Sequence, residues 1–250
     1  MMSLRLLSLL FLPTVAISLA TETPARQPWE FGRFVKQSSK FVTIPFLPGP
    51  SSKSTVIAPG TILWQPSSSS SSSSFSFGPL DDVVMGGASS STFDDASGTW
   101  TGQVTDANNG GFIGIRSFPA CQWDMSACQG IELKLRGGKL GKRFKVVLRD
   151  STDFNGICWT TSVDVGGGLP KLFRNVLNRD GNDVTTSTVR VPFDKQIPTI
   201  FAKTVPGKSF QKDSVVGVQF AYSKFEYDGE LNPMFEVGDV ELQILEIKAY

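Results

Sequence analysis

Apolar and polar residues alternate in short runs through most of the chain after residue 75. In GIELKLRG (130–137) apolar residues occupy every second position with charged residues between them, and KRFKVVLRD (142–150) repeats the pattern. Successive side chains of a strand point to opposite faces, so each run predicts a strand with one buried face. The glycine-containing GGKLG between them predicts a hairpin. The side chains expected to face the core are Ile131, Leu133, Leu135, Phe144, Val146 and Leu148.

Further runs of the same kind predict an all-β domain over residues 75–250. No stretch keeps the 3.6-residue period of a long helix, although KLFRNVLNRD (171–180) allows a turn or two. Many short strands separated by Gly and Pro turns indicate a sandwich or a barrel. The other predicted strands are TWTGQV (99–104), GFIGIRS (111–117), ICWTTSV (157–163), STVRVPF (187–193), SVVGVQFAY (214–222) and the final run from 235 to 250.

The final run contains one break in the alternation. Val240, Leu242 and Ile244 share parity, whereas Leu245 and Ile247 have the opposite parity. A β-bulge or an edge transition at Ile244–Leu245 would keep both apolar sets facing the core.

The N-terminal third has a different texture. Residues 1–20 carry Arg5, an apolar run and a small residue at the end, which predicts a signal-peptide-like segment cleaved after Ala20. Residues 21–74 are basic, acid-poor and rich in Ser, which is typical of either a transit segment or a disordered spacer. They end in a run of eight serines, Ser67–Ser74, which predicts a linker. We expect no transmembrane span in the mature protein.

Composition removes most catalytic possibilities. The 250 residues include no histidine, which excludes Ser-His-Asp and Cys-His arrangements and any His-ligated metal. Cys121, Cys128 and Cys158 have no CxxC spacing, so they are either buried idle thiols or, in an oxidising compartment, include a Cys121–Cys128 pair. We therefore predict no catalytic residue, no metal site and no cofactor, and we expect the protein not to be an enzyme.

Two pairs of adjacent glycines could belong either to phosphate-binding loops or to tight turns. They lie in DDVVMGGASSSTF (81–93) and NNGGFIGIRS (108–117). Neither has the spacing of a nucleotide-binding loop, and both lead into strand patterns rather than a helix. Gly adopts positive φ at little cost and Asn or Asp closes turns on its own backbone, so turns are favoured.

These segments, together with WTGQV, GIELKLRG, RFKVVLRD, VPF and NPMFEVGDVELQILEIKAY in that order, resemble the CIA30 domain of the complex I intermediate-associated protein 30 family. The resemblance covers essentially all of 75–250. It implies a galactose-binding-like jelly-roll β-sandwich and a role in assembling the respiratory NADH:ubiquinone oxidoreductase. Relatives also occur in photosynthetic organelles. The signal-like N-terminus differs from an Arg-rich mitochondrial presequence, so mitochondrion, plastid and secretory pathway stay open.

Two surfaces are candidates for partner binding. The first is the pair of glycine loops, for which simple turn geometry is the alternative explanation. The second is a basic stripe on the outward positions of the 130–137 and 142–149 strands, which forms if the two strands pair. The candidate residues are Asp82, Gly86, Gly87, Ser89, Asn109, Gly110, Gly111 and Arg116 for the loops, and Lys134, Arg136, Arg143, Lys145 and Arg149 for the stripe.

The leading hypothesis is a non-catalytic assembly factor that binds subunits or subcomplexes of an organellar electron-transport complex. One rival is an RNA-associated plastid factor that uses the basic stripe, although residues 75–250 hold 21 Asp and Glu against 18 Lys and Arg. Another rival is a carbohydrate-binding module, which would need exposed tryptophans. We expect Trp100, Trp123 and Trp159 to lie in the core instead.

Overall fold

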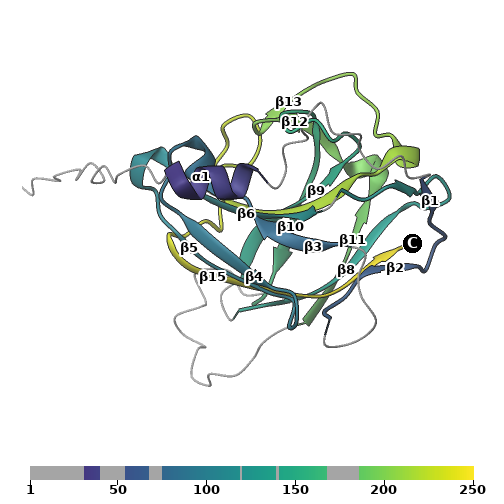
Figure 1. Ribbon diagram of the computed structural model, residues 1–250, viewed down its shortest axis with the longest axis horizontal. Helices are drawn as coiled ribbons and strands as arrows, with labels where there is room; N and C mark the ends of the chain where they lie inside the picture. Colours follow the sequence, from purple (N-terminus) through teal and green to yellow (C-terminus); the bar gives the residue numbers. More distant parts are fainter. Residues whose placement is uncertain (1–30, 40–53, 68–74, 119, 139–140, 168–185) are drawn as a thin grey trace, which may run out of the picture.

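The computed structural model describes residues 31–39, 54–67, 75–118, 120–138, 141–167 and 186–250. The predicted signal-like segment and the turn expected at 171–180 lie outside these residues. Figure 1 shows two layers of strands, with β15, β4 and β8 in one layer and β6 and β9 in the other. The predicted jelly-roll β-sandwich is confirmed.

One layer is a seven-stranded antiparallel sheet in the order β13-β12-β10-β9-β14-β6-β3. Its strands are β3 (Ser76–Pro79), β6 (Phe112–Phe118), β9 (Lys142–Arg149), β10 (Cys158–Val165), β12 (Ile197–Ile200), β13 (Lys203–Thr204) and β14 (Gly217–Ser223).

The other layer is a six-stranded antiparallel sheet in the order β11-β8-β15-β5-β4, with β2 paired to β15. Its strands are β2 (Ile62–Trp64), β4 (Ser90–Asp94), β5 (Thr99–Val104), β8 (Gly130–Gly137), β11 (Thr186–Pro192) and β15 (Gly238–Ala249).

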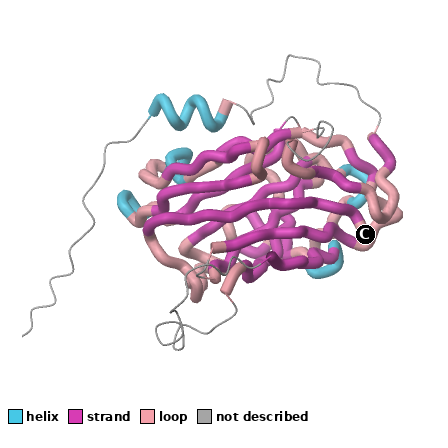
Figure 2. The backbone as a smooth tube through the Cα atoms, turned by 90° about the horizontal axis from the view of Figure 1, so that it is seen from below, coloured by secondary structure: helices cyan, strands magenta, loops and turns pink. Residues whose placement is uncertain are grey.

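Short elements close the ends of the sandwich. They are α1 (Phe31–Ser38), the parallel pair β1 (Thr55–Val56) and β7 (Trp123–Asp124), and the 3-10 turns η1 (Asp82–Met85), η2 (Ala107–Asn109), η3 (Phe193–Lys195) and η4 (Lys212–Ser214). Figure 2 shows α1 lying outside the stacked strands.

The core lies between the two layers. All six apolar side chains predicted to face inward in β8 and β9 are almost completely buried, which confirms the alternation. The layers meet through aromatic contacts: the rings of Trp100 in β5 and Phe144 in β9 have centroids 6.0 Å apart. Trp100, Trp123 and Trp159 are all buried, as predicted.

The predicted bulge in the last strand is also confirmed. The register of β15 against β8 shifts between Ile244 and Glu246. Ile244 and Ile247 are both fully buried as a result, although their positions have opposite parity.

The hairpin predicted between β8 and β9 is wrong. β8 pairs with β11 and β15, whereas β9 pairs with β10 and β14, so consecutive strands belong to opposite layers. A short glycine-containing connector permits a hairpin, but it serves equally well where the chain crosses from one sheet to the other.

The spacer predicted for residues 21–74 is wrong for two segments. β1 and β2 lie within it, and β2 pairs with β15 through Trp64, which is buried. Residues 31–38 form α1, which is anchored to the sandwich by side chains described below.

Candidate functional site

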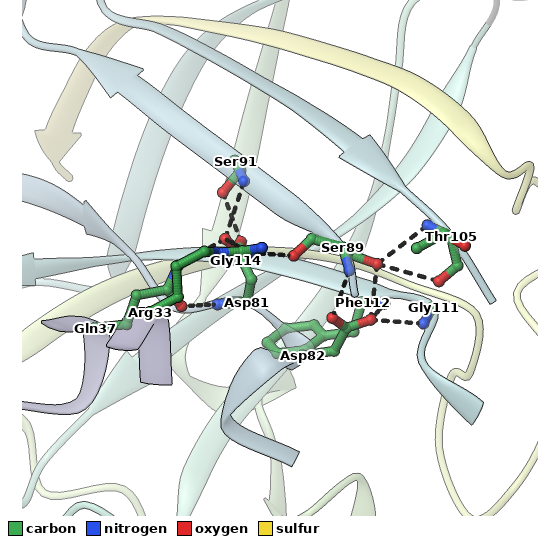
Figure 3. A network of polar contacts seen from close by, with 10 residues as sticks. All are labelled: Arg33, Gln37, Asp81, Asp82, Ser89, Ser91, Thr105, Gly111, Phe112 and Gly114. Carbon is green, nitrogen blue, oxygen red and sulfur yellow. Dashed lines mark hydrogen bonds and ion pairs between the residues drawn. The ribbon is translucent and has the colours of Figure 1, made fainter. Parts of the chain in front are cut away.

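Asp82, the first residue of η1, is buried and ties two glycine loops together. One carboxylate oxygen accepts a hydrogen bond from the Ser89 amide at 2.9 Å. The other accepts from the Ser89 hydroxyl at 2.7 Å and from the amides of Gly111 at 2.9 Å and Phe112 at 3.3 Å. Figure 3 shows these bonds converging on one carboxylate from the loop before β4 and from the start of β6, which fixes the relative position of the loops.

The double glycines are needed to close around this carboxylate. A Cβ at Gly87 would lie 2.2 Å from Cγ of Asp82, and one at Gly110 would lie 2.4 Å from Oδ2. Gly86 and Gly111 instead require positive φ, at 90° and 115°. The loops are therefore turns, and their direct contact with a partner stays a prediction.

Asp81 is also buried, but it faces a different set of donors. It accepts from the amide of Ser91 at 2.9 Å, from its hydroxyl at 2.6 Å, and from Nε2 of Gln37 at 2.9 Å. Nη2 of Arg33 lies 3.9 Å from Oδ2. Burial raises the pKa of Asp81, and the bonds from Ser91 and Gln37 oppose that rise. Gln37 and Arg33 belong to α1, so this carboxylate anchors the helix (Figure 3).

A groove of about 710 Å³ runs over the outer face of the seven-stranded sheet. Its floor uses the residues of β9 that alternate with the core positions, namely Lys145, Val147 and Arg149. Its neighbours on the floor are Arg116 of β6 and Gln219 of β14. The glycine loops and Asp82 lie at the β6 end, and Phe201 and Ala202, in the turn after β12, lie at the other.

The cations of the floor are held by neutral groups. Nζ of Lys145 donates to the carbonyls of Phe225 at 2.7 Å and Glu226 at 2.6 Å, and burial lowers its pKa while the Glu226 charge opposes this. Nη1 of Arg149 donates to Sγ of Cys158 at 3.1 Å. Such contacts keep the positive charges in place over the sheet.

Arg116 holds the other side of the floor. Its Nε donates to Oε1 of Gln219 at 3.0 Å, and its guanidinium lies 5.2 Å from the centroid of the Phe154 ring. Burial, followed by repulsion from Arg149, lowers the pKa of Arg116 to about 10. The two guanidinium groups therefore share one electrostatic environment.

In the structure, the predicted glycine loops and part of the predicted basic stripe line the same groove. Among the predicted residues, those that line the groove are Asp82, Gly87, Asn109, Gly110, Gly111, Arg116, Lys145 and Arg149. Gly86 and Ser89 do not line it: Gly86 caps η1, and Ser89 is the buried partner of Asp82.

The basic stripe itself is wrong, because its two strands lie in different sheets. Lys134 and Arg136 are on the outer face of the six-stranded sheet, where Nη1 of Arg136 donates to Oε1 of Gln243 at 3.1 Å. Arg143 is bound to Asp164 of β10, with Nε and Oδ1 2.6 Å apart. No continuous positive band therefore joins Lys134 to Lys145.

Several groove residues were not among those predicted. Four of them are aromatic residues from loops, and no local sequence pattern places them together. They are Phe154, Phe201, Phe225 and Tyr227.

Other features of the described residues bear on chemistry. Cys121, Cys128 and Cys158 are free thiols, and burial raises the pKa of Cys121 to about 12. In the part of the chain that the structure describes, no cluster of three His, Cys, Asp or Glu side chains could hold a metal. No helix within these described ranges is long and apolar enough to cross a membrane.

Comparison with known proteins gives one match in sequence. Residues 66–244 match the family described as complex I intermediate-associated protein 30 (CIA30). No curated protein matches the chain in sequence.

Among solved structures, a family 11 carbohydrate-binding module from Clostridium thermocellum, in complex with a β-1,3-1,4-mixed-linked tetrasaccharide, has 12% identity and a TM-score of 0.44. That alignment covers 78% of this chain and 96% of the module. An exo-β-agarase has 9% identity and a TM-score of 0.40, over 76% of this chain and 26% of the agarase chain. These similarities carry no inference about ligands.

Proposed function

Because the chain belongs to the complex I intermediate-associated protein 30 family, we propose that it is a non-catalytic assembly factor for mitochondrial complex I. In this role it binds subunits or subcomplexes of the NADH:ubiquinone oxidoreductase while they are being built. The observation that carries the proposal is the extent of the family match, residues 66–244. That range includes strands of both sheets and both glycine loops, so the match spans the sandwich rather than one motif.

The geometry of the groove supports binding rather than proton transfer. The Asp82 carboxylate accepts four hydrogen bonds, and Lys145 donates to two carbonyl groups. A general acid or base needs to exchange a proton with a substrate, whereas these groups are fixed by the protein itself. A preformed groove with fixed charges suits recognition of a partner.

The test is affinity purification of the full-length protein, tagged at the C-terminus, from its own cells in mild detergent at low and moderate salt. Mass spectrometry of the retained proteins should identify complex I subunits in excess over an untagged control strain. Recovery of photosystem or thylakoid proteins instead would move the protein to plastid biogenesis. Retention only on RNA or glycans would contradict an assembly role.

A further inference from the structure

Arg149 is a buried cation that faces the groove. It is only 3% exposed, and it donates to Sγ of Cys158 and to the carbonyl of Asp153. Among the residues that the structure describes, no carboxylate forms an ion pair with it. A desolvated charge without a counter-charge is costly, so this guanidinium is well prepared to receive an anion.

Arg116 reaches the same part of the groove from the other side of β14. In the sheet register Arg116 is opposite Gln219, and Arg149 is opposite Gly217, two residues earlier on the same strand. The loop between β9 and β10 contacts both guanidinium groups, through Phe154 and through the Asp153 carbonyl. Two guanidinium groups held near each other bind a carboxylate more strongly than one, because the anion also relieves their mutual repulsion.

The rim of the groove carries apolar side chains that are exposed to solvent. Phe201 is 74% exposed, and Met85 and Phe225 are also exposed. Phe201 and Ala202 have φ values of 49° and 61°, a left-handed conformation that is unfavourable for such side chains. Asp228 holds this turn by accepting hydrogen bonds from the amide and hydroxyl of Thr204 at 2.8 and 2.6 Å.

The groove is long enough for an extended peptide. Its lining residues come from five adjacent strands, β12, β10, β9, β14 and β6. At about 4.8 Å between neighbouring strands, four intervals span roughly 19 Å, or about six residues of extended chain. A groove of this length, with cations in its floor and aromatic groups at its rim, complements an acidic segment that also carries apolar side chains.

We propose that the groove binds an extended segment of a complex I subunit, with an Asp or Glu carboxylate on Arg116 and Arg149 and an apolar side chain against Phe201. The assignment rests on the proposed function and names the surface through which the assembly intermediate is held. Free small anions and neutral glycans are the alternative occupants, and the test below separates them.

The experiment is photo-crosslinking in the full-length protein in its own cells. p-Benzoylphenylalanine replaces Phe201 in one variant and Val56 in a matched control, because both side chains are 74% exposed and Val56 lies outside the groove. Crosslinked peptides are mapped by mass spectrometry after purification. The Phe201 position is then combined with Arg149→Gln, Arg149→Lys or Arg116→Gln, and thermal unfolding of each purified variant establishes that it is folded.

We expect crosslinks from position 201, and not from 56, to map to one short stretch of a complex I subunit that contains Asp or Glu. Arg149→Gln should lower the yield about tenfold and Arg149→Lys less, since lysine keeps the charge without the bidentate geometry. If Arg149→Gln does not fold, the crosslinking yield of Arg116→Gln is used in its place, and we expect that yield to fall as well.

Three results would overturn the assignment. One is a crosslinked segment without a carboxylate, and another is a yield that neither Gln variant lowers. The third is the absence of crosslinks at 201 while complex I subunits still copurify, as expected for a small anion or a glycan; this leaves the proposed function intact. If no complex I subunit copurifies, the proposed function fails and the assignment fails with it.

Discussion

The outer faces of the two sheets carry similar charged residues in different surroundings. On the six-stranded sheet, Glu132 bridges two cations at the surface, with Arg190 at 2.9 Å and Lys248 at 2.7 Å. On the seven-stranded sheet, Lys145 and Arg149 are buried and donate to neutral groups at the floor of a groove. A carboxylate balances the cations on the first face, whereas carbonyl groups and a thiol hold the two cations on the second. The same alternating pattern therefore produces a surface of paired charges on one sheet and a groove with buried cations on the other.

Of the variants compared between the two faces, Gly87→Ala should lose the most stability relative to its control. The new Cβ would overlap the Asp82 carboxylate and displace it from its donors, so we expect a loss of about 3 kcal/mol in the free energy of unfolding. Gly138, which follows β8, has no atom within 4 Å of its would-be Cβ, so Gly138→Ala should be neutral or slightly stabilising. Urea unfolding measures both; equal losses would contradict the close packing around Asp82.

The second comparison removes one carboxylate from the groove, at Asp82, and one from the outer face of the six-stranded sheet, at Glu132. Asp82→Asn places an amide where four hydrogen bonds are accepted, so at least one buried donor loses its acceptor, at a cost of about 2 kcal/mol. Glu132→Gln should change stability little, because exposed ion pairs are screened by water. Thermal and urea unfolding at pH 7 test this. A larger loss for Glu132→Gln would show that the surface pairs, rather than the buried carboxylate, hold the fold.

The pH dependence of stability should have opposite signs for Asp81 and Glu132. Burial raises the pKa of Asp81 above 3.8, so the folded protein takes up this proton before the unfolded chain does. The wild type should therefore gain stability relative to Asp81→Asn as the pH falls from above the raised pKa toward 3.8. Hydrogen bonds from Lys248 and Arg190 lower the pKa of Glu132, so the wild type should lose stability relative to Glu132→Gln as the pH falls below about 4.5.

Urea unfolding of the wild type and both variants between pH 3.5 and 7 measures the two differences. Slopes of the same sign would contradict the assigned environments. Subtracting each variant from the wild type removes the contributions of all other groups.

The smallest effect is a difference between two lysines. Burial lowers the pKa of Lys145 below 10.5, whereas the hydrogen bond to Glu132 raises that of Lys248. NMR titration of ¹³C-labelled lysine side chains, assigned with Lys145→Arg and Lys248→Arg, should show Lys145 deprotonating first. Coincident midpoints would mean that the two faces do not differ in polarity.

The sequence allowed prediction of what is encoded locally. Alternation in 130–137 and 142–149 identified the core-facing side chains of β8 and β9, and the break after Ile244 identified the bulge. Both depend only on the direction in which neighbouring side chains point. The family resemblance supplied the prediction of the sandwich and the expectation of an assembly role.

Features that depend on distant parts of the chain could not be predicted. The layer to which β8 or β9 belongs depends on pairing with β11, β15, β10 and β14, and the connector between them has no signal for it. The anchoring of α1 depends on Gln37 meeting Asp81, 44 residues later. The groove likewise combines a strand residue, Arg149, with Phe201 from a distant turn.

The most direct test of the account is complementation of cells that lack the protein, with assembled complex I measured on native gels. We expect complex I to be depleted in these cells and restored by the wild type and by Arg136→Gln, the matched variant on the six-stranded sheet. Arg149→Gln, expressed at the same level, should not restore it. Normal complex I without the protein, or full restoration by Arg149→Gln, would contradict the claim that the groove serves assembly of the complex.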